Sequence, residues 1–168
     1  NSMIYLPVSN NNPSGLCILN FKKYIDCELN SSPGMGQSLT QILSKCKNIS
    51  LNNLNFDNIP DFAFMTMYDS NMGINIRINN SLGINAFMFA HVQSIKLTTQ
   101  NKDGIRLSQR CFWETNVNYI DLLDFKTTYI DEGVFSNCKA EDILFKDTPL
   151  THIGDNAFKL NLPQITVI

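Results

Sequence analysis

A pattern of apolar residues recurs at a nearly constant interval through most of the chain, and it limits the fold more than any other feature. A phenylalanine returns at spacings of 25, 23, 23 and 23 residues, always five residues after an aliphatic residue and just after a small or apolar one. A single repeat of this length cannot bury its own apolar side, whereas stacked repeats bury a continuous column. The sequence therefore predicts a solenoid. The aligned residues are Phe64, Phe89, Phe112, Phe135 and Phe158; Ile59, Ile84, Leu107, Ile130 and Ile153; and Ala63, Met88, Cys111, Val134 and Ala157.

A short run that alternates between apolar and polar residues precedes each of these blocks, as expected for a strand with one buried face. From the last apolar residue of a run to the next aligned aliphatic there are eight residues, for example from Leu122 to Ile130, but ten from Leu97 to Leu107. We therefore expect a two-residue insertion within residues 98–104, where Gly104 permits an unusual turn. The runs begin at Ile49, Ile74, Ile95, Ile120, Ile143 and Ile165.

The chain before residue 48 lacks the repeat. Residues 1–16 are predicted to be an extended lead-in, and residues 17–47 an N-terminal cap made of a hairpin and a short amphipathic helix. Residues 48–168 hold about five repeats. Cys17 and Cys27 lie in the predicted hairpin, where a disulfide staple is the favoured interpretation and a redox pair or half of a metal site is the alternative. Cys46 lies near enough to the cap to compete for that disulfide.

Several segments resemble known units. "INIRINNSLGINAF", "YIDEGVFSNC" and "THIGDNAF" resemble the leucine-rich repeat family, and "IGDNAF" and "VFSNC" resemble its BspA-like branch. "NISLNNLNFDNIPDFAF" resembles a first repeat of extracellular animal members, and the segment ending in "IDCEL" resembles a trimmed N-terminal cysteine cap. The consensus Asn of the family is replaced near Leu54, Phe125 and Thr148, and only Asn79 matches it.

The resemblance implies an α/β solenoid, wound as a right-handed superhelix. Its parallel β-sheet would line the concave face, short helical or irregular segments the convex face, and a hairpin would cap the N-terminus. It also implies a protein that binds other proteins, without enzymatic activity and without a cofactor.

Composition narrows the class of partner. The chain is 43% hydrophobic and 17% charged, with a net charge of −2 and no basic cluster, which argues against nucleic-acid binding. No apolar run reaches the roughly 20 residues that a membrane helix needs. N-glycosylation sequons begin at Asn30, Asn48 and Asn79. Together with the Cys17 and Cys27 pair they favour a secreted, extracellular glycoprotein.

No pattern of catalytic or metal-binding residues stands out, and we predict neither. His91 and His152 occupy non-equivalent repeat positions, so nothing brings them together. Cys111 and Cys138 fall in slots that are apolar in other repeats and are interpreted as small core residues. Trp113, which follows an aligned phenylalanine, is either packing at the rim or an anchor for a partner.

The outward residues of the predicted strands form the candidate binding surface. Their apolar members, with Arg77 and Lys96 nearby, suit a protein contact, and a solvated face is the alternative. Asn48 lies at the cap end of this face, so a glycan there would block it. The predicted partner-binding residues are Asn75, Arg77, Lys96, Thr98, Tyr119, Asp121, Leu123, Leu144 and Lys146.

The sequence stops in a strand-like run, "QITVI". We expect either that the chain is a fragment of a longer protein or that its uncapped C-terminal repeat pairs end to end with another chain. The second possibility makes self-association, or a role as a structural or regulatory subunit of an extracellular complex, the alternative function.

Overall fold

The structure is a computed structural model of the 168-residue chain. It describes residues 3–6, 17–20, 25–26, 48–49, 51–59, 61–159 and 164–168, with side chains from residue 55 onward except at positions 69 and 164. The predictions of a helix within residues 37–47, of a disulfide between Cys17 and Cys27, and of a role for Cys46 lie outside this description.

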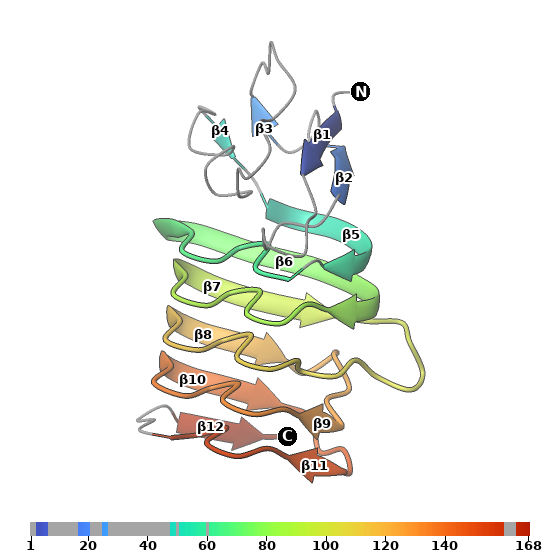
Figure 1. The fold of residues 1–168 in the computed structure, drawn as a ribbon, viewed down its shortest axis with the longest axis vertical. Helices are drawn as coiled ribbons and strands as arrows, with labels where there is room; N and C mark the ends of the chain where they lie inside the picture. The colour runs from blue at the N-terminus through green and yellow to red at the C-terminus, as the bar shows by residue number, and fades with distance from the viewer. Residues whose placement is uncertain are drawn as a thin grey trace.

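Six parallel strands form the main sheet and lie one below the other along the length of the molecule (Figure 1). The strand order is β12-β10-β8-β7-β6-β5, so each coil adds the next strand to the sheet. These strands are β5 (Leu51–Ile59), β6 (Tyr68–Leu82), β7 (His91–Thr98), β8 (Asn116–Leu122), β10 (Lys139–Phe145) and β12 (Gln164–Val167).

The predicted alternation sets the register of the sheet from the second coil onward. Ile74 pairs with Ile95, Ile95 with Ile120 and Ile120 with Ile143. All four isoleucines are at most 1% exposed. The first coil differs from the prediction. Leu51, rather than Ile49, is the partner of Ile74, and a register shift follows before the next pair.

The two strands expected to form a hairpin with each other in the cap have other partners. β2 (Cys17–Asn20) pairs antiparallel with β1 (Met3–Leu6), and β3 (Ile25–Asp26) pairs antiparallel with β4 (Asn48–Ile49). Asn48 therefore belongs to a small separate sheet and not to the main one.

Across the core from the main sheet, each coil passes through a turn segment, which runs in front of the sheet in Figure 1. Its backbone N–H groups alternate in direction. The N–H of Phe64 donates to Ala86 O of the next coil at 2.7 Å, whereas that of Met65 donates to Phe62 O of its own coil at 3.2 Å. This alternation links the coils and closes successive tight turns. In the described residues these segments are turns and no α-helix is present, so of the predicted helical or irregular convex segments the irregular form is found.

Positive φ angles explain why the segment turns without becoming helical. They recur two residues before and two residues after the buried phenylalanine in the coils of Phe64 to Phe135, and two residues before Phe158. A left-handed residue interrupts right-handed winding. The residues concerned are Phe62, Thr66, Asn85, Phe89, Arg110, Glu114, Gly133, Asn137 and Asn156.

Stacked phenylalanine rings form a spine between the sheet and the turn segments. Neighbouring rings lie 5.0, 5.4, 5.5 and 5.3 Å apart along the series, with interplanar angles of 4° to 19°. Its members are Phe64, Phe87, Phe112, Phe135 and Phe158.

The assignment of the second repeat to Phe89 is wrong, because Phe87 occupies the spine. Phe87 is fully buried, whereas the ring of Phe89 lies on the surface with 43% exposure. The companion residues shift by the same two positions. Leu82 is buried where Ile84 was predicted, and Ile84 is 37% exposed.

The third side of the coil is short. β9 (Tyr129–Ile130) pairs in parallel with β11 (His152–Ile153), and Leu107 joins the same row by a bridge to Ile130. The long connection before Leu107 is the predicted insertion. Gly104 lies within it at φ +77°, and a Cβ there would lie 2.1 Å from Lys126 O, so only glycine fits.

Candidate functional site

The outer face of the main sheet carries the predicted binding residues in rows that cross the strands. Tyr119 on β8 stands opposite Ser94 on β7 and Asp142 on β10. In the next row Lys96 stands opposite Asp121, and Asp121 opposite Leu144. Parallel in-register strands about 4.8 Å apart bring these side chains into one continuous surface.

Seven of the nine predicted residues lie on strands of this sheet. Asn75 and Arg77 are on β6, Lys96 and Thr98 on β7, Tyr119 and Asp121 on β8, and Leu144 on β10. Leu123 and Lys146 lie just past the ends of β8 and β10.

Tyr119 is an exposed aromatic group of this face, with 43% exposure. Leu144 is its diagonal neighbour and is half-buried. Arg77 and Lys96 lie on the neighbouring strands β6 and β7. Asp121 and Asp142 lie on the same two strands as the pair, with Asp142 opposite Tyr119 and Asp121 opposite Leu144. The face therefore has an apolar pair that alternates with two carboxylates, with basic groups on the strands to one side.

Two of the acidic groups are already engaged within the protein. Asp121 Oδ1 accepts a hydrogen bond from the backbone N–H of Leu123 at 3.0 Å. Asp142 Oδ1 accepts one from Thr166 Oγ1 on β12, also at 3.0 Å. These bonds fix both carboxylates in place, which reduces the entropy lost when a partner binds.

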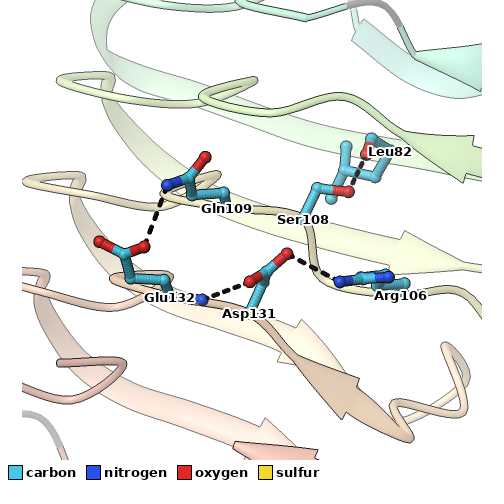
Figure 2. A network of polar contacts seen from close by, with 6 residues as sticks. All are labelled: Leu82, Arg106, Ser108, Gln109, Asp131 and Glu132. Atoms are coloured by element: carbon cyan, nitrogen blue, oxygen red, sulfur yellow. Dashed lines mark hydrogen bonds and ion pairs between the residues drawn. The ribbon is translucent and has the colours of Figure 1, made fainter. Parts of the chain in front are cut away.

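A second polar network, which sequence reasoning did not identify, crosses the coils on the short third side (Figure 2). Arg106 forms an ion pair with Asp131 at 3.0 Å, and Asp131 Oδ1 also accepts from the N–H of Glu132 at 2.7 Å. Gln109 Nε2 donates to Glu132 Oε2 at 3.2 Å, and Ser108 Oγ donates to Leu82 O. Each contact joins one coil to a neighbour or fixes a carboxylate that does so.

Arg106, Tyr129 and His152 stack in a column on the same side. The guanidinium carbon of Arg106 lies 3.7 Å from the centroid of the Tyr129 ring, and the Tyr129 and His152 rings lie 4.4 Å apart. Each of the three precedes a residue of the aligned aliphatic series, Leu107, Ile130 or Ile153. The repeat alignment contained this signal, although no residue type repeats.

The two histidines pack against tyrosine rings, and the thiols of Cys111 and Cys138 are buried. His91 packs edge-on against Tyr68, and His152 stacks on Tyr129. Burial raises the pKa of the Cys138 thiol from 9.0 to about 12, and burial also raises the pKa of Cys111 well above its usual value. Both thiols therefore stay protonated at neutral pH, which suits core residues and not nucleophiles.

Two further observations concern metals and membranes. In the part of the chain that the structure describes, no three His, Cys, Asp or Glu side chains group together in a way that would hold a metal ion. Among the same residues, no helix has the length and apolarity needed to cross a bilayer.

The stacked coils, the parallel sheet and the phenylalanine spine define a repeat solenoid. The family description "BspA type Leucine rich repeat region" matches residues 27–114 and 57–167, in 6 copies. The chain belongs to this BspA-type leucine-rich repeat family, whose members generally take part in protein interactions. No curated protein and no solved structure matches it in the comparisons.

Proposed function

We propose that this protein is a secreted, non-catalytic binding protein that contacts a partner protein through the outer face of its main sheet. The observation that carries the proposal is the exposed Tyr119 diagonal to Leu144. Asp121 and Asp142 alternate with this pair on the same strands, and Arg77 and Lys96 lie on the neighbouring strands. Aromatic and aliphatic centres with a polar rim are typical of protein interfaces.

The experiment is affinity capture from the native fluid, followed by mass spectrometry. We expect a partner that the wild-type protein retains and that the double variant Tyr119→Ser/Leu144→Ser loses. Leu150→Ser is the matched control, because Leu150 is 46% exposed but lies outside the sheet. Equal capture by the wild-type protein and the double variant would contradict a binding role for this face.

Secretion is supported by the cysteine pair and the sequons, and expression in eukaryotic cells tests it. A glycan on Asn30 or Asn48 would slow migration in a gel until a glycosidase removes it. In the folded protein Asn79 Nδ2 donates to Asp57 Oδ1 at 3.0 Å and to Asn55 Oδ1 at 3.2 Å, so a glycan on Asn79 would disturb these two bonds. Protein retained inside the cells without modification would contradict secretion.

The alternative is a structural or regulatory subunit that associates through β12. This strand borders the described sheet, and Ile165, Val167 and Ile168 are 45%, 60% and 66% exposed. Exposed apolar residues on an edge strand favour pairing with another chain. Light scattering after size exclusion distinguishes the two functions, since a dimer that Val167→Lys converts to a monomer would favour the subunit.

A further inference from the structure

Phe89 is an unusual residue for its place in the coil. It adopts φ +60°, a conformation that bulky side chains rarely adopt, and it remains 43% exposed. The equivalent positions in the flanking coils are polar: Thr66, Glu114 and Asn137, each two residues after a spine phenylalanine. Because Phe87 already completes the spine, the core does not require an aromatic ring at position 89.

The ring of Phe89 is held against Trp113, the single tryptophan of the chain. Their centroids lie 5.8 Å apart with an interplanar angle of 35°. The guanidinium carbon of Arg110 lies 5.1 Å from the Trp113 ring, and Arg110 also pairs with Glu132 at 3.5 Å. Phe89 is thus placed by Trp113 on the next coil, and Trp113 by Arg110 of its own turn segment. Phe, Trp and Arg are residue types that anchor protein interfaces.

Two carboxylates, those of Glu114 and Glu132, and one guanidinium, that of Arg110, belong to the turn segments next to the two rings. Glu114 follows Trp113 directly, is exposed, and occupies the position of Phe89 one coil further on. The charge of Arg110 is already met by Glu132, whose side chain is 46% exposed and also accepts from Gln109. A complementary partner therefore carries a positive charge next to its apolar contact.

We propose that Phe89 and Trp113 form a second docking surface, on the turn side of the solenoid. Its occupant is a protein segment that presents an apolar side chain next to a Lys or Arg. The apolar side chain packs on the two rings, and the cation faces Glu114. Both residues belong to the turn segments, which lie across the core from the main sheet (Figure 1). The surface is therefore independent of the sheet-face function proposed above.

Because Trp113 is part of this surface, its fluorescence gives a direct readout of binding there. A displayed library of short random peptides is selected on the wild-type protein, and enriched sequences are synthesised without tryptophan. The expected peptides contain an apolar residue adjacent to Lys or Arg. Their titration shifts the emission of Trp113 and protects it from acrylamide quenching, because the ring becomes covered.

Matched variants separate this surface from the sheet face. Phe89→Asn places in this coil the residue found at the equivalent position 137, and it should weaken peptide binding by about tenfold or more. Glu114→Lys should also weaken peptide binding, and the loss should be larger at low salt. Tyr119→Ser/Leu144→Ser should leave peptide binding unchanged. Circular dichroism verifies that each variant folds.

The proposal is overturned if no peptide is enriched, if enriched peptides lack a basic residue, or if binding survives Phe89→Asn. Peptides lost only in the Tyr119→Ser/Leu144→Ser variant would overturn it as well, while supporting the sheet face. Partner capture by the Tyr119→Ser/Leu144→Ser variant therefore tests the sheet-face function, and peptide binding tests the Phe89–Trp113 surface. The failure of one proposal is thus distinguishable from the failure of the other.

Discussion

At the scale of single residues, the turn segments require positive φ at defined positions, and the residues at those positions suit this conformation to different degrees. In the coils of Phe64 to Phe135 two positions have positive φ, one on either side of the spine phenylalanine, and Asn156 has it before Phe158. Gly133, Asn137 and Asn156 suit this conformation, whereas Thr66 and Glu114 adopt it at a cost of about 1–2 kcal/mol.

Exchanging residues between equivalent positions should change stability in opposite directions. We expect Glu114→Asn to raise the free energy of unfolding by about 0.5–1 kcal/mol, since asparagine adopts positive φ more readily. Asn137→Glu should lower it by a similar amount. Urea denaturation followed by circular dichroism measures both. Changes of the same sign would show that backbone conformation does not control these positions.

The buried thiols predict how stability depends on pH. The pKa of Cys138 rises from 9.0 to about 12 in the folded protein, chiefly because burial desolvates the thiolate. Above pH 9 the unfolded chain loses the proton while the folded chain keeps it. Stability should therefore be fully present below pH 9 and fall between pH 9 and 12, by about 1.4 kcal/mol per pH unit for this thiol.

The variant Cys138→Ala tests that dependence. Alanine already fills the equivalent slot at Ala90, which is fully buried, so the variant should fold. Its stability should fall less steeply between pH 9 and 12 than that of the wild-type protein. Identical slopes in denaturation curves across this range would contradict a role for the Cys138 thiol.

At the scale of the elements, the spine shows which buried phenylalanines the period of the sequence can identify and which it cannot. Both Leu82–Phe87 and Ile84–Phe89 place a phenylalanine five residues after an aliphatic residue, so spacing alone could not separate them. The fold selects the first pair, because β6 continues without a break to Leu82. A finer signal was present, since Ala86 precedes Phe87 just as alanine precedes Phe64 and Phe158.

Substituting the two phenylalanines should give very different results. Phe87→Ala removes a fully buried ring from between Phe64 and Phe112 and should cost about 3–5 kcal/mol. Phe89→Ala removes a half-exposed ring and should cost about 1 kcal/mol or less. Thermal or urea unfolding of both variants measures the difference, and equal losses would contradict the assignment of the spine.

At the scale of the whole molecule, the sequence predicted the solenoid and the residues on its sheet face, because both follow from regular periods. It did not predict the contacts between side chains that differ from coil to coil. The stack of Arg106, Tyr129 and His152 and the pair of Phe89 and Trp113 depend on which unlike residues become neighbours. Which of these residues become neighbours is determined by the register of the coils.

Because each coil contacts mainly its neighbours, the molecule should tolerate the removal of one complete coil. β10 matches β8 in register from Lys139 opposite Asn116 to Phe145 opposite Leu122. Deleting residues 116–138 would therefore place β10 beside β7, with Ile143 opposite Ile95, and bring the ring of Phe158 beside that of Phe112. The shortened protein keeps an unbroken sheet and an unbroken spine.

We expect this deletion variant to unfold cooperatively, with lower stability than the full chain because one interface between coils is lost. Deleting residues 116–127 is the control, since removing half a coil leaves the remaining strands and spine residues out of register. That variant should lose the cooperative transition in thermal circular dichroism. If both deletions behave alike, the coils are not interchangeable units, and the stability of the molecule is not a sum over neighbouring coils.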